Sequence, residues 1–152
     1  MAFVLLFPSS AMLSFAEAPG ELVESISVGT TPIAVAVDEF QQRSLVVNQG
    51  SNNVSIVDTG PLTVIATLNV GTTPKDIGLH KPSGTAYVTN SGSDNLSLID
   101  LSLSQVVDTI TVGDGPDGIE VLDGALKAIG TFGNRITSTD AGSVAWKWIY
   151  LT

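Results

Sequence analysis

The segment Gly113-Asp114-Gly115-Pro116-Asp117-Gly118 has the G-x-G-x-x-G spacing with which dinucleotide-binding proteins hold a pyrophosphate. That chemistry needs a strand before the glycines and a helix after them, with the helix N-terminus on the phosphates. Here Ile119-Glu120-Val121 follows and alternates like a strand, and two aspartates would face the phosphates. We therefore expect a turn and not a nucleotide site.

The aspartates of this chain could also serve as oxygen ligands for calcium. The spacing of an EF-hand loop is absent, however, and no glutamate stands at the closing position. Aspartates in turns commonly bond their own backbone. Asp58 and Asp100 recur at the same place in two similar segments, which predicts a structural hydrogen bond to a turn, because a catalytic carboxylate has no need to recur.

His80 is the one histidine, and the chain has no cysteine, so the histidine cannot build a zinc site with sulfur ligands. No G-x-S-x-G elbow accompanies it, and we expect a solvated histidine in a turn. Asn53-Val54-Ser55 and Asn95-Leu96-Ser97 satisfy the glycosylation sequon. Because both occupy one repeat position, we interpret them as asparagines at strand-turn junctions. No cofactor and no metal is expected.

Both tryptophans lie near the C-terminus, where alternation places four side chains on one side of a strand. Such a face could anchor a protein partner or a carbohydrate, or it could pack on the preceding strands. The sequence leaves these alternatives open. The four residues are Val144, Trp146, Trp148 and Tyr150.

The formal charge of -9 makes the surface repel phosphate backbones, so no nucleic-acid partner is expected. Residues 1–18 have an apolar run and end in Ala16-Glu17-Ala18, which predicts a signal peptide cleaved after Ala18 and a periplasmic or extracellular protein. The first basic residue is Arg43, so the usual positive leader is missing, and a buried strand or short helix stays an alternative. The run is too short to span a membrane.

A repeat must position these residues. The pentapeptide Val28-Gly29-Thr30-Thr31-Pro32 returns at 70–74, and 14 of 42 positions are identical between residues 28–69 and 70–111. Apolar residues alternate in four short runs per unit, separated by Gly, Pro, Asn, Asp and Ser, as in strands joined by tight turns. In the first unit the runs are Ile33–Val37, Ser44–Asn48, Val54–Asp58 and Val64–Asn69. A four-stranded antiparallel unit of this length matches one blade of a β-propeller.

The pentapeptide is then a hinge between blades. We expect its glycine to turn the chain with a positive φ and its proline to fix φ before the next blade. Loops that ring one end of a rigid scaffold also carry function. The candidate ligand- or partner-facing residues are Thr30, Thr31, Thr72, Thr73, Asp114 and Asp117.

Tyr87-Val88-Thr89-Asn90 is the tetrapeptide that names the YVTN family of β-propeller repeats, and residues 91–100 are similar to the second and third strands of that family. The first unit departs from it with Leu45-Val46-Val47-Asn48. The resemblance covers residues 22 to about 121. It implies an extracytoplasmic protein related in shape to WD40, lactonase-like and cytochrome d1-type propellers, and it leaves open a haem-ligand role for His80.

The sequence thus predicts an all-β partial propeller of about three four-stranded blades. The expected units are a signal peptide at 1–18, an orphan outer strand at 19–27, blades at 28–69 and 70–111, and a degenerate third blade with tail at 112–152. One deletion in the third unit would place Leu151-Thr152 opposite Ile110-Thr111. Because closed propellers use about 4–8 blades, we expect either a fragment of a longer propeller or copies that assemble through open blade faces.

These residues favour a non-catalytic binding or cell-envelope scaffold module, although the enzyme question stays open. Its expected partners are a protein, a cell-envelope component or further propeller blades. The alternatives are a fragment of a lactonase-like or cytochrome d1-like enzyme, whose active residues lie in other blades, and a purely structural surface-layer repeat. An enzyme site would need His, Arg or clustered acids at the axis, and the two well-formed repeats hold one histidine and one arginine.

Overall fold

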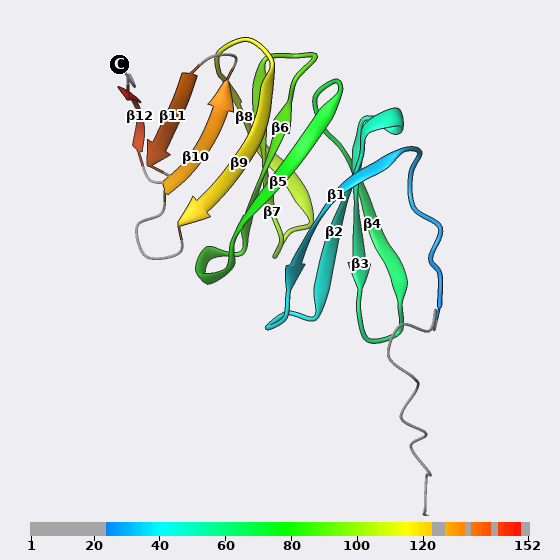
Figure 1. Ribbon diagram of the computed structural model, residues 1–152. Coiled ribbons are helices and arrows are strands. Elements are labelled where there is room, and N and C mark those ends of the chain that lie inside the picture. Colours follow the sequence, from blue (N-terminus) through cyan, green and yellow to red (C-terminus); the bar gives the residue numbers. More distant parts are fainter. Residues whose placement is uncertain (1–23, 123–126, 133–134, 141–142, 150–152) are drawn as a thin grey trace, which may run out of the picture.

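The computed structural model describes residues 24–122, 127–132, 135–140 and 143–149, with side chains placed for 24–121. The chain forms three four-stranded antiparallel sheets, each built from consecutive strands (Figure 1). The first holds β1 (Pro32–Asp38), β2 (Arg43–Asn48), β3 (Asn53–Asp58) and β4 (Thr63–Asn69). The second holds β5 (Pro74–His80), β6 (Thr85–Asn90), β7 (Asn95–Asp100) and β8 (Gln105–Thr111). The third holds β9 (Pro116–Leu122), β10 (Lys127–Phe132), β11 (Arg135–Asp140) and β12 (Ser143–Ile149). The predicted all-β partial propeller is confirmed.

The first two sheets repeat each other in register as well as in sequence. In both, the pairing of the first two strands is irregular near the proline, between Pro32 and Ala34 and between Pro74 and Asp76. A second irregularity follows Ile56 in the first sheet and Leu98 in the second. Because bulges increase local strand twist, the shared bulges bend both sheets at the same places.

The core lies between neighbouring sheets, whose first strands β1, β5 and β9 lie side by side (Figure 1). One cluster joins the first two sheets and another joins the second and third. The first comprises Leu45, Val47, Val54, Ile56, Ile77, Ala86, Val88, Ile99 and Leu101, and the second comprises Tyr87, Leu96 and Ile119. Burial therefore depends on stacking, because each sheet contributes half of an apolar layer.

The third sheet keeps four strands despite its decayed sequence, and its last strands follow one another more closely along the chain than those of the second sheet. Two residues separate β10 from β11 and two separate β11 from β12, where the second sheet has four at each place. β12 therefore begins 38 residues after the start of β8, and not 42. Leu151-Thr152, whose predicted position depended on a single deletion, lie outside the described residues.

Residues 24–28 have no regular secondary structure, so the predicted outer strand at 19–27 is not formed in its described part. A strand needs a neighbouring edge to accept its hydrogen bonds, and this segment pairs with none of the three sheets. Residues 19–23 and the predicted signal peptide at 1–18 lie outside the described residues. Within the part that the structure describes, no helix is long and apolar enough to cross a membrane.

Candidate functional site

The sheets present two ends with different loops. The hinges before β1, β5 and β9 lie together with the turn from β2 to β3, which contains η1 (Gln49–Ser51), and this end is called the hinge end. The β1–β2 connection and η2 (Lys81–Ser83) lie at the other end, called the turn end. In Figure 1 the hinge end is at the top and the turn end is below.

The hinge glycine does not have the predicted positive φ. The left-handed residue is instead Thr31 (φ 51°) in the first hinge, Thr73 (φ 50°) in the second and Gly115 (φ 58°) in the third. Glycine is needed two residues earlier, at Gly29 and Gly71, because neighbouring atoms leave no space for a Cβ there. A Cβ on Gly71 would overlap the Ser93 hydroxyl and lie 2.6 Å from Asn90 Cγ. The close packing of the Ser93 and Asn90 side chains on the Gly71 backbone, and not a turn conformation, therefore explains the repeated glycine.

The structure brings five of the predicted site residues to successive hinges at one end, and Asp117 lies at the start of β9, next to the third hinge. All six are exposed: Thr30, Thr31, Thr72, Thr73, Asp114 and Asp117. The backbone of the hinge is itself engaged, because Thr30 N–H donates to Ser51 Oγ at 3.1 Å and Thr72 N–H donates to Ser93 Oγ at 3.0 Å. The threonine and aspartate side chains thus line a fixed rim, and their role toward a ligand stays a prediction.

A buried polar network lies beneath each of the first two hinges. In the first sheet Asn48 Nδ2 donates to Asn53 Oδ1 and Ser55 Oγ, both at 2.9 Å. In the second sheet Asn90 Nδ2 donates to Asn95 Oδ1 at 2.8 Å and to Ser97 Oγ at 3.0 Å. The two sequon asparagines are therefore acceptors in these networks. In the sequence these networks are indicated by the fact that the same Asn and Ser residues occupy equivalent positions in both units.

The last residue of the β2–β3 turn and of the β6–β7 turn binds the hinge of the next sheet. Asn52 Oδ1 accepts from Thr73 N–H at 2.9 Å, and Asp94 Oδ1 accepts from Gly115 N–H at 2.8 Å. On the inner strand, Asp76 Oδ2 accepts from Ile119 N–H at 3.0 Å. The second and third hinges are therefore each held by a side chain from the preceding sheet, which limits their freedom to rearrange.

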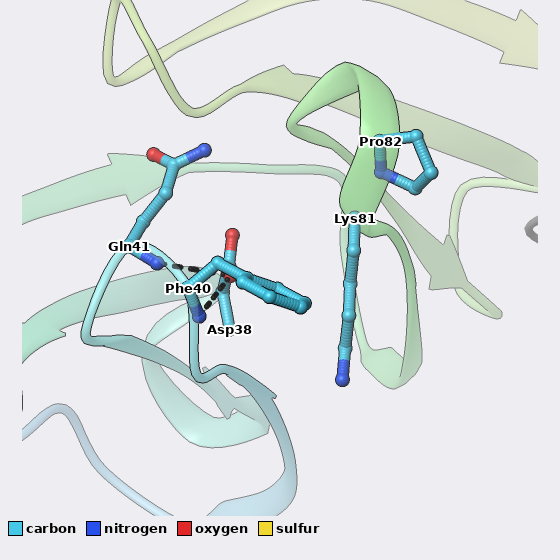
Figure 2. Close-up of a pocket in the computed structure, with 5 residues that line it drawn as sticks. All are labelled: Asp38, Phe40, Gln41, Lys81 and Pro82. Carbon is cyan, nitrogen blue, oxygen red and sulfur yellow. Dashed lines mark hydrogen bonds between the residues drawn. The ribbon is translucent and has the colours of Figure 1, made fainter.

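A hollow of about 280 Å³ lies at the turn end between the first two sheets. Asp38, Phe40, Gln41, Lys81 and Pro82 line it (Figure 2). Asp38 is 1% exposed, whereas Phe40 is 87% exposed. Asp38 Oδ1 accepts from the N–H groups of Phe40 at 3.1 Å and Gln41 at 3.2 Å, while Oδ2 is buried without a hydrogen-bond partner. This hollow was not predicted from the sequence, since its residues come from two different repeats.

His80 occupies in the second repeat the place that Asp38 has in the first. The expectation of a solvated histidine was wrong, since His80 is 3% exposed. Its Nδ1 accepts from Ser83 N–H at 3.2 Å and lies 2.6 Å from Ser83 Oγ. His80 thus caps η2 much as Asp38 caps its own turn, because both side chains accept from backbone N–H groups just beyond the strand.

The two recurrent strand-end aspartates confirm the predicted structural role. Asp58 Oδ1 accepts from Gly60 N–H at 2.9 Å, and Asp100 Oδ1 accepts from Ser102 N–H at 2.8 Å and Leu103 N–H at 3.2 Å. The Ser102 hydroxyl, with the Leu103 N–H, holds the pKa of Asp100 below its usual value. Elsewhere, burial raises the pKa of Tyr87. Among the described residues, no three His, Cys, Asp or Glu side chains gather as a metal site.

The first sheet leaves an apolar face uncovered, called here the open face. It consists of Ile33, Val35 and Val37 on β1, which are 42%, 62% and 47% exposed. In the second sheet the matching positions are less exposed: Ile77, the counterpart of Val35, is 7% exposed, and Lys75 and Leu79 are half-buried. The predicted aromatic face near the C-terminus cannot be compared in this way: Trp146 and Trp148 lie on β12 with side chains outside the described set, as does all of Tyr150.

Solved structures match this arrangement. A Kuenenia stuttgartiensis hydrazine synthase chain aligns with a TM-score of 0.72 and 22% identity over 84% of this chain and 38% of that one. The beta-propeller domain of Myceliophteria thermophila Cps50 (Swd1) aligns with a TM-score of 0.71 and 12% identity over 86% of this chain and 40% of its own. A chain of a nidogen/laminin complex aligns with a TM-score of 0.67 and 14% identity over 79% and 48%, respectively.

The chain has the fold of a β-propeller segment. Its similarity to WD40-like propellers is confirmed at the level of the fold. It spans less than half the length of each of these matched structures. No protein-family model matches the sequence, and no curated protein matches it either. At these identities the match establishes architecture alone.

Proposed function

We propose that this propeller-blade module is an exported YVTN-type repeat that serves as a non-catalytic binding or cell-envelope scaffold, and that its open face stacks on a further blade. The Tyr87-Val88-Thr89-Asn90 motif and the 42-residue repeat support the family assignment. The exposed hinge threonines and aspartates provide the rim to which a protein or cell-envelope ligand binds.

The single observation that carries the proposal is the contrast between Val35 at 62% exposure and Ile77 at 7%. Ile77 is buried because the preceding sheet lies on it, and Val35 stands at the same place with no sheet over it. Contiguous exposed apolar surface on a rigid sheet favours association. A four-stranded blade is the occupant that fits, because the same face already packs against one in the next repeat.

Solution mass tests this proposal. We expect the wild-type chain to associate with increasing concentration, measured by analytical ultracentrifugation, and the Val35→Lys variant to remain monomeric with an unchanged far-UV circular dichroism spectrum. The matched control is Lys75→Ala on β5, which leaves the open face intact and retains association. A wild-type chain that stays monomeric at every concentration contradicts the proposed stacking.

Export is tested separately in a bacterial host. Fusion of residues 1–27 to a reporter enzyme that works only outside the cytoplasm is expected to give activity, and mass spectrometry of the mature chain is expected to begin at Pro19. Replacement of Ala18 by a bulky residue, Ala18→Trp, should block the cleavage. Retention of the reporter in the cytoplasm would remove export from the proposal and leave the stacking unaffected.

A further inference from the structure

The hollow at the turn end holds a carboxylate oxygen with no hydrogen-bond partner. Asp38 Oδ2 is buried, while Oδ1 is occupied by the N–H groups of Phe40 and Gln41. Figure 2 shows the free oxygen turned away from these two N–H groups, toward the side on which Gln41 and Pro82 stand. A buried acceptor without a donor is costly, so a group that supplies a donor at this place gains that free energy on binding.

We propose that this hollow binds a primary ammonium group, carried by a small alkylamine or by a lysine side chain. The ammonium donates to Asp38 Oδ2, and the Phe40 ring covers the adjoining methylenes. Only one acceptor is free, which suits the single-point donation of an ammonium better than the paired donation of a guanidinium.

The backbone prepares Asp38 for this role. Two N–H groups at 3.1 and 3.2 Å fix the orientation of the carboxylate, so its second oxygen is already placed before a ligand arrives. A preorganised acceptor loses little freedom on binding, which favours affinity. Asp100 accepts from two backbone N–H groups in the same way, but it is the last residue of β7 and does not line this hollow.

The walls of the hollow suit an amine with a short carbon chain. Phe40 and Pro82 are exposed apolar groups, and a cation beside an aromatic ring gains a further attraction. Gln41 is exposed as well, so the side chains above Asp38 can move aside for a ligand. Figure 2 shows the Lys81 side chain extended with its ammonium away from the Asp38 carboxylate.

Charge also favours a cation here. The formal charge of -9 attracts cations to the surface as a whole. Lys81 opposes this attraction locally, because its ammonium repels a second one at the same hollow. The proposal therefore predicts opposite effects for the two charged residues: removal of the Asp38 charge weakens binding, and removal of the Lys81 charge strengthens it.

The experiment is an NMR titration of the full chain with n-butylammonium chloride, followed through the backbone amide signals of Phe40 and Gln41. We expect saturable shifts with a dissociation constant on the order of 1 mM, as befits a ligand of few atoms. Asp38→Asn should weaken binding about 10-fold or more, because it removes a charged hydrogen bond. Lys81→Met should strengthen binding about 2- to 5-fold, because it removes a like charge at a solvated site.

Three controls make the outcome specific. Asp100→Asn should leave the affinity unchanged. n-Butanol, which lacks charge, and tetramethylammonium, which lacks an N–H donor, should each bind at least about 10-fold more weakly than butylammonium. Nα-acetyl-lysine-N-methylamide distinguishes the two sources: affinity equal to or greater than that of butylammonium indicates a peptide lysine, and much weaker affinity indicates a free amine.

The asparagine variant keeps a side-chain oxygen for the Phe40 and Gln41 N–H groups and is expected to fold. Equal affinity of wild type and Asp38→Asn, or tetramethylammonium binding as tightly as butylammonium, overturns the proposal. Weaker binding by Lys81→Met also contradicts it, since Lys81 would then be part of the site. None of these results depends on whether the open face stacks on another blade.

Discussion

The first and second sheets have the same strand order, the same bulges and matching residues, yet they differ in burial. Val35 and Ile77 occupy equivalent positions and are 62% and 7% exposed. The position of Ser44 in the first sheet is taken by Ala86 in the second, and that of Thr59 by Leu101, which is fully buried. At these two positions the second sheet, which has a neighbour on this face, is apolar where the first sheet is polar.

This difference shows that the hydrogen bonds within a blade do not depend on its neighbour, whereas the burial of its apolar face does. Interactions within a repeat, such as the asparagine network under the hinge, are the same in both sheets. Interactions between repeats exist only where a second sheet is present. In such a stacked array, stability is a sum of repeat and interface contributions, so equivalent substitutions separate the two.

The largest expected effect comes from truncating the equivalent pair. Ile77→Ala should lower the free energy of unfolding by about 2–5 kcal/mol, because it leaves a cavity between two sheets. Val35→Ala should change it by less than about 0.5 kcal/mol, because its side chain already contacts water. Urea denaturation at a concentration where the chain is monomeric measures both. Equal losses for the two variants would falsify the idea that the sheets differ in their neighbours.

Alanine at the two hinge glycines should destabilise the first and second sheets equally. Gly29→Ala and Gly71→Ala should each cost about 1–3 kcal/mol, because each new Cβ overlaps atoms of its own repeat. Gly60→Ala is the control, since its nearest neighbour is Asp58 Oδ1 at 3.3 Å. Thermal or urea unfolding of the three variants gives the comparison. A marked difference between Gly29→Ala and Gly71→Ala would mean that the hinge also depends on the neighbouring sheet.

The left-handed position of the hinge is Thr31 or Thr73 in the first two hinges and Gly115 in the third, which suggests exchanging the two residue types. Thr73→Gly should stabilise the fold by about 0.5–1.5 kcal/mol, because a β-branched residue is strained at positive φ and glycine is not. Gly115→Thr should destabilise it by a similar amount. Unfolding midpoints of both variants decide the matter. If Thr73→Gly lowers the midpoint, the threonine side chain contributes more to the hinge than its strain costs.

The smallest effect concerns the aspartate turns. Because Ser102 and Leu103 hold the pKa of Asp100 below its usual 3.8, this carboxylate adds stability above that pH and loses it as pH falls through the lower folded value. Ser102→Ala should raise the pKa of Asp100 toward 3.8, measured by NMR titration of the carboxyl carbon. The first repeat has Gly60 in place of Ser102, so the hydroxyl is a feature of the second repeat alone. An unchanged pKa in Ser102→Ala would assign the shift to the backbone N–H groups.

Much of the architecture was predictable because strand alternation and turn residues are local. The four predicted runs of the first unit match β1 to β4 to within one residue at each end. The roles of Asp58 and Asp100 followed from their recurrence and are confirmed. The hinge glycine was assigned the wrong reason, since a close contact with residues about 20 positions away cannot be read from the pentapeptide.

The hollow at the turn end and the burial of His80 were beyond the sequence for the same reason. Asp38 and Lys81 are 43 residues apart and come together only when two sheets stack. In the third repeat the strands β10 and β11 form although the sequence there no longer aligns with the other repeats, so sequence alignment alone did not reveal them.

The sequence by itself determined the four-stranded repeat unit, the order of its strands and the position of the hinges, because these follow from short-range alternation and turn chemistry repeated along the chain. Only the tertiary structure decided which equivalent face is buried, which glycine needs space and which aspartate faces a hollow. Each of those depends on atoms of another strand or sheet, and packing at contact distance is a property of the assembled fold and not of the local chain.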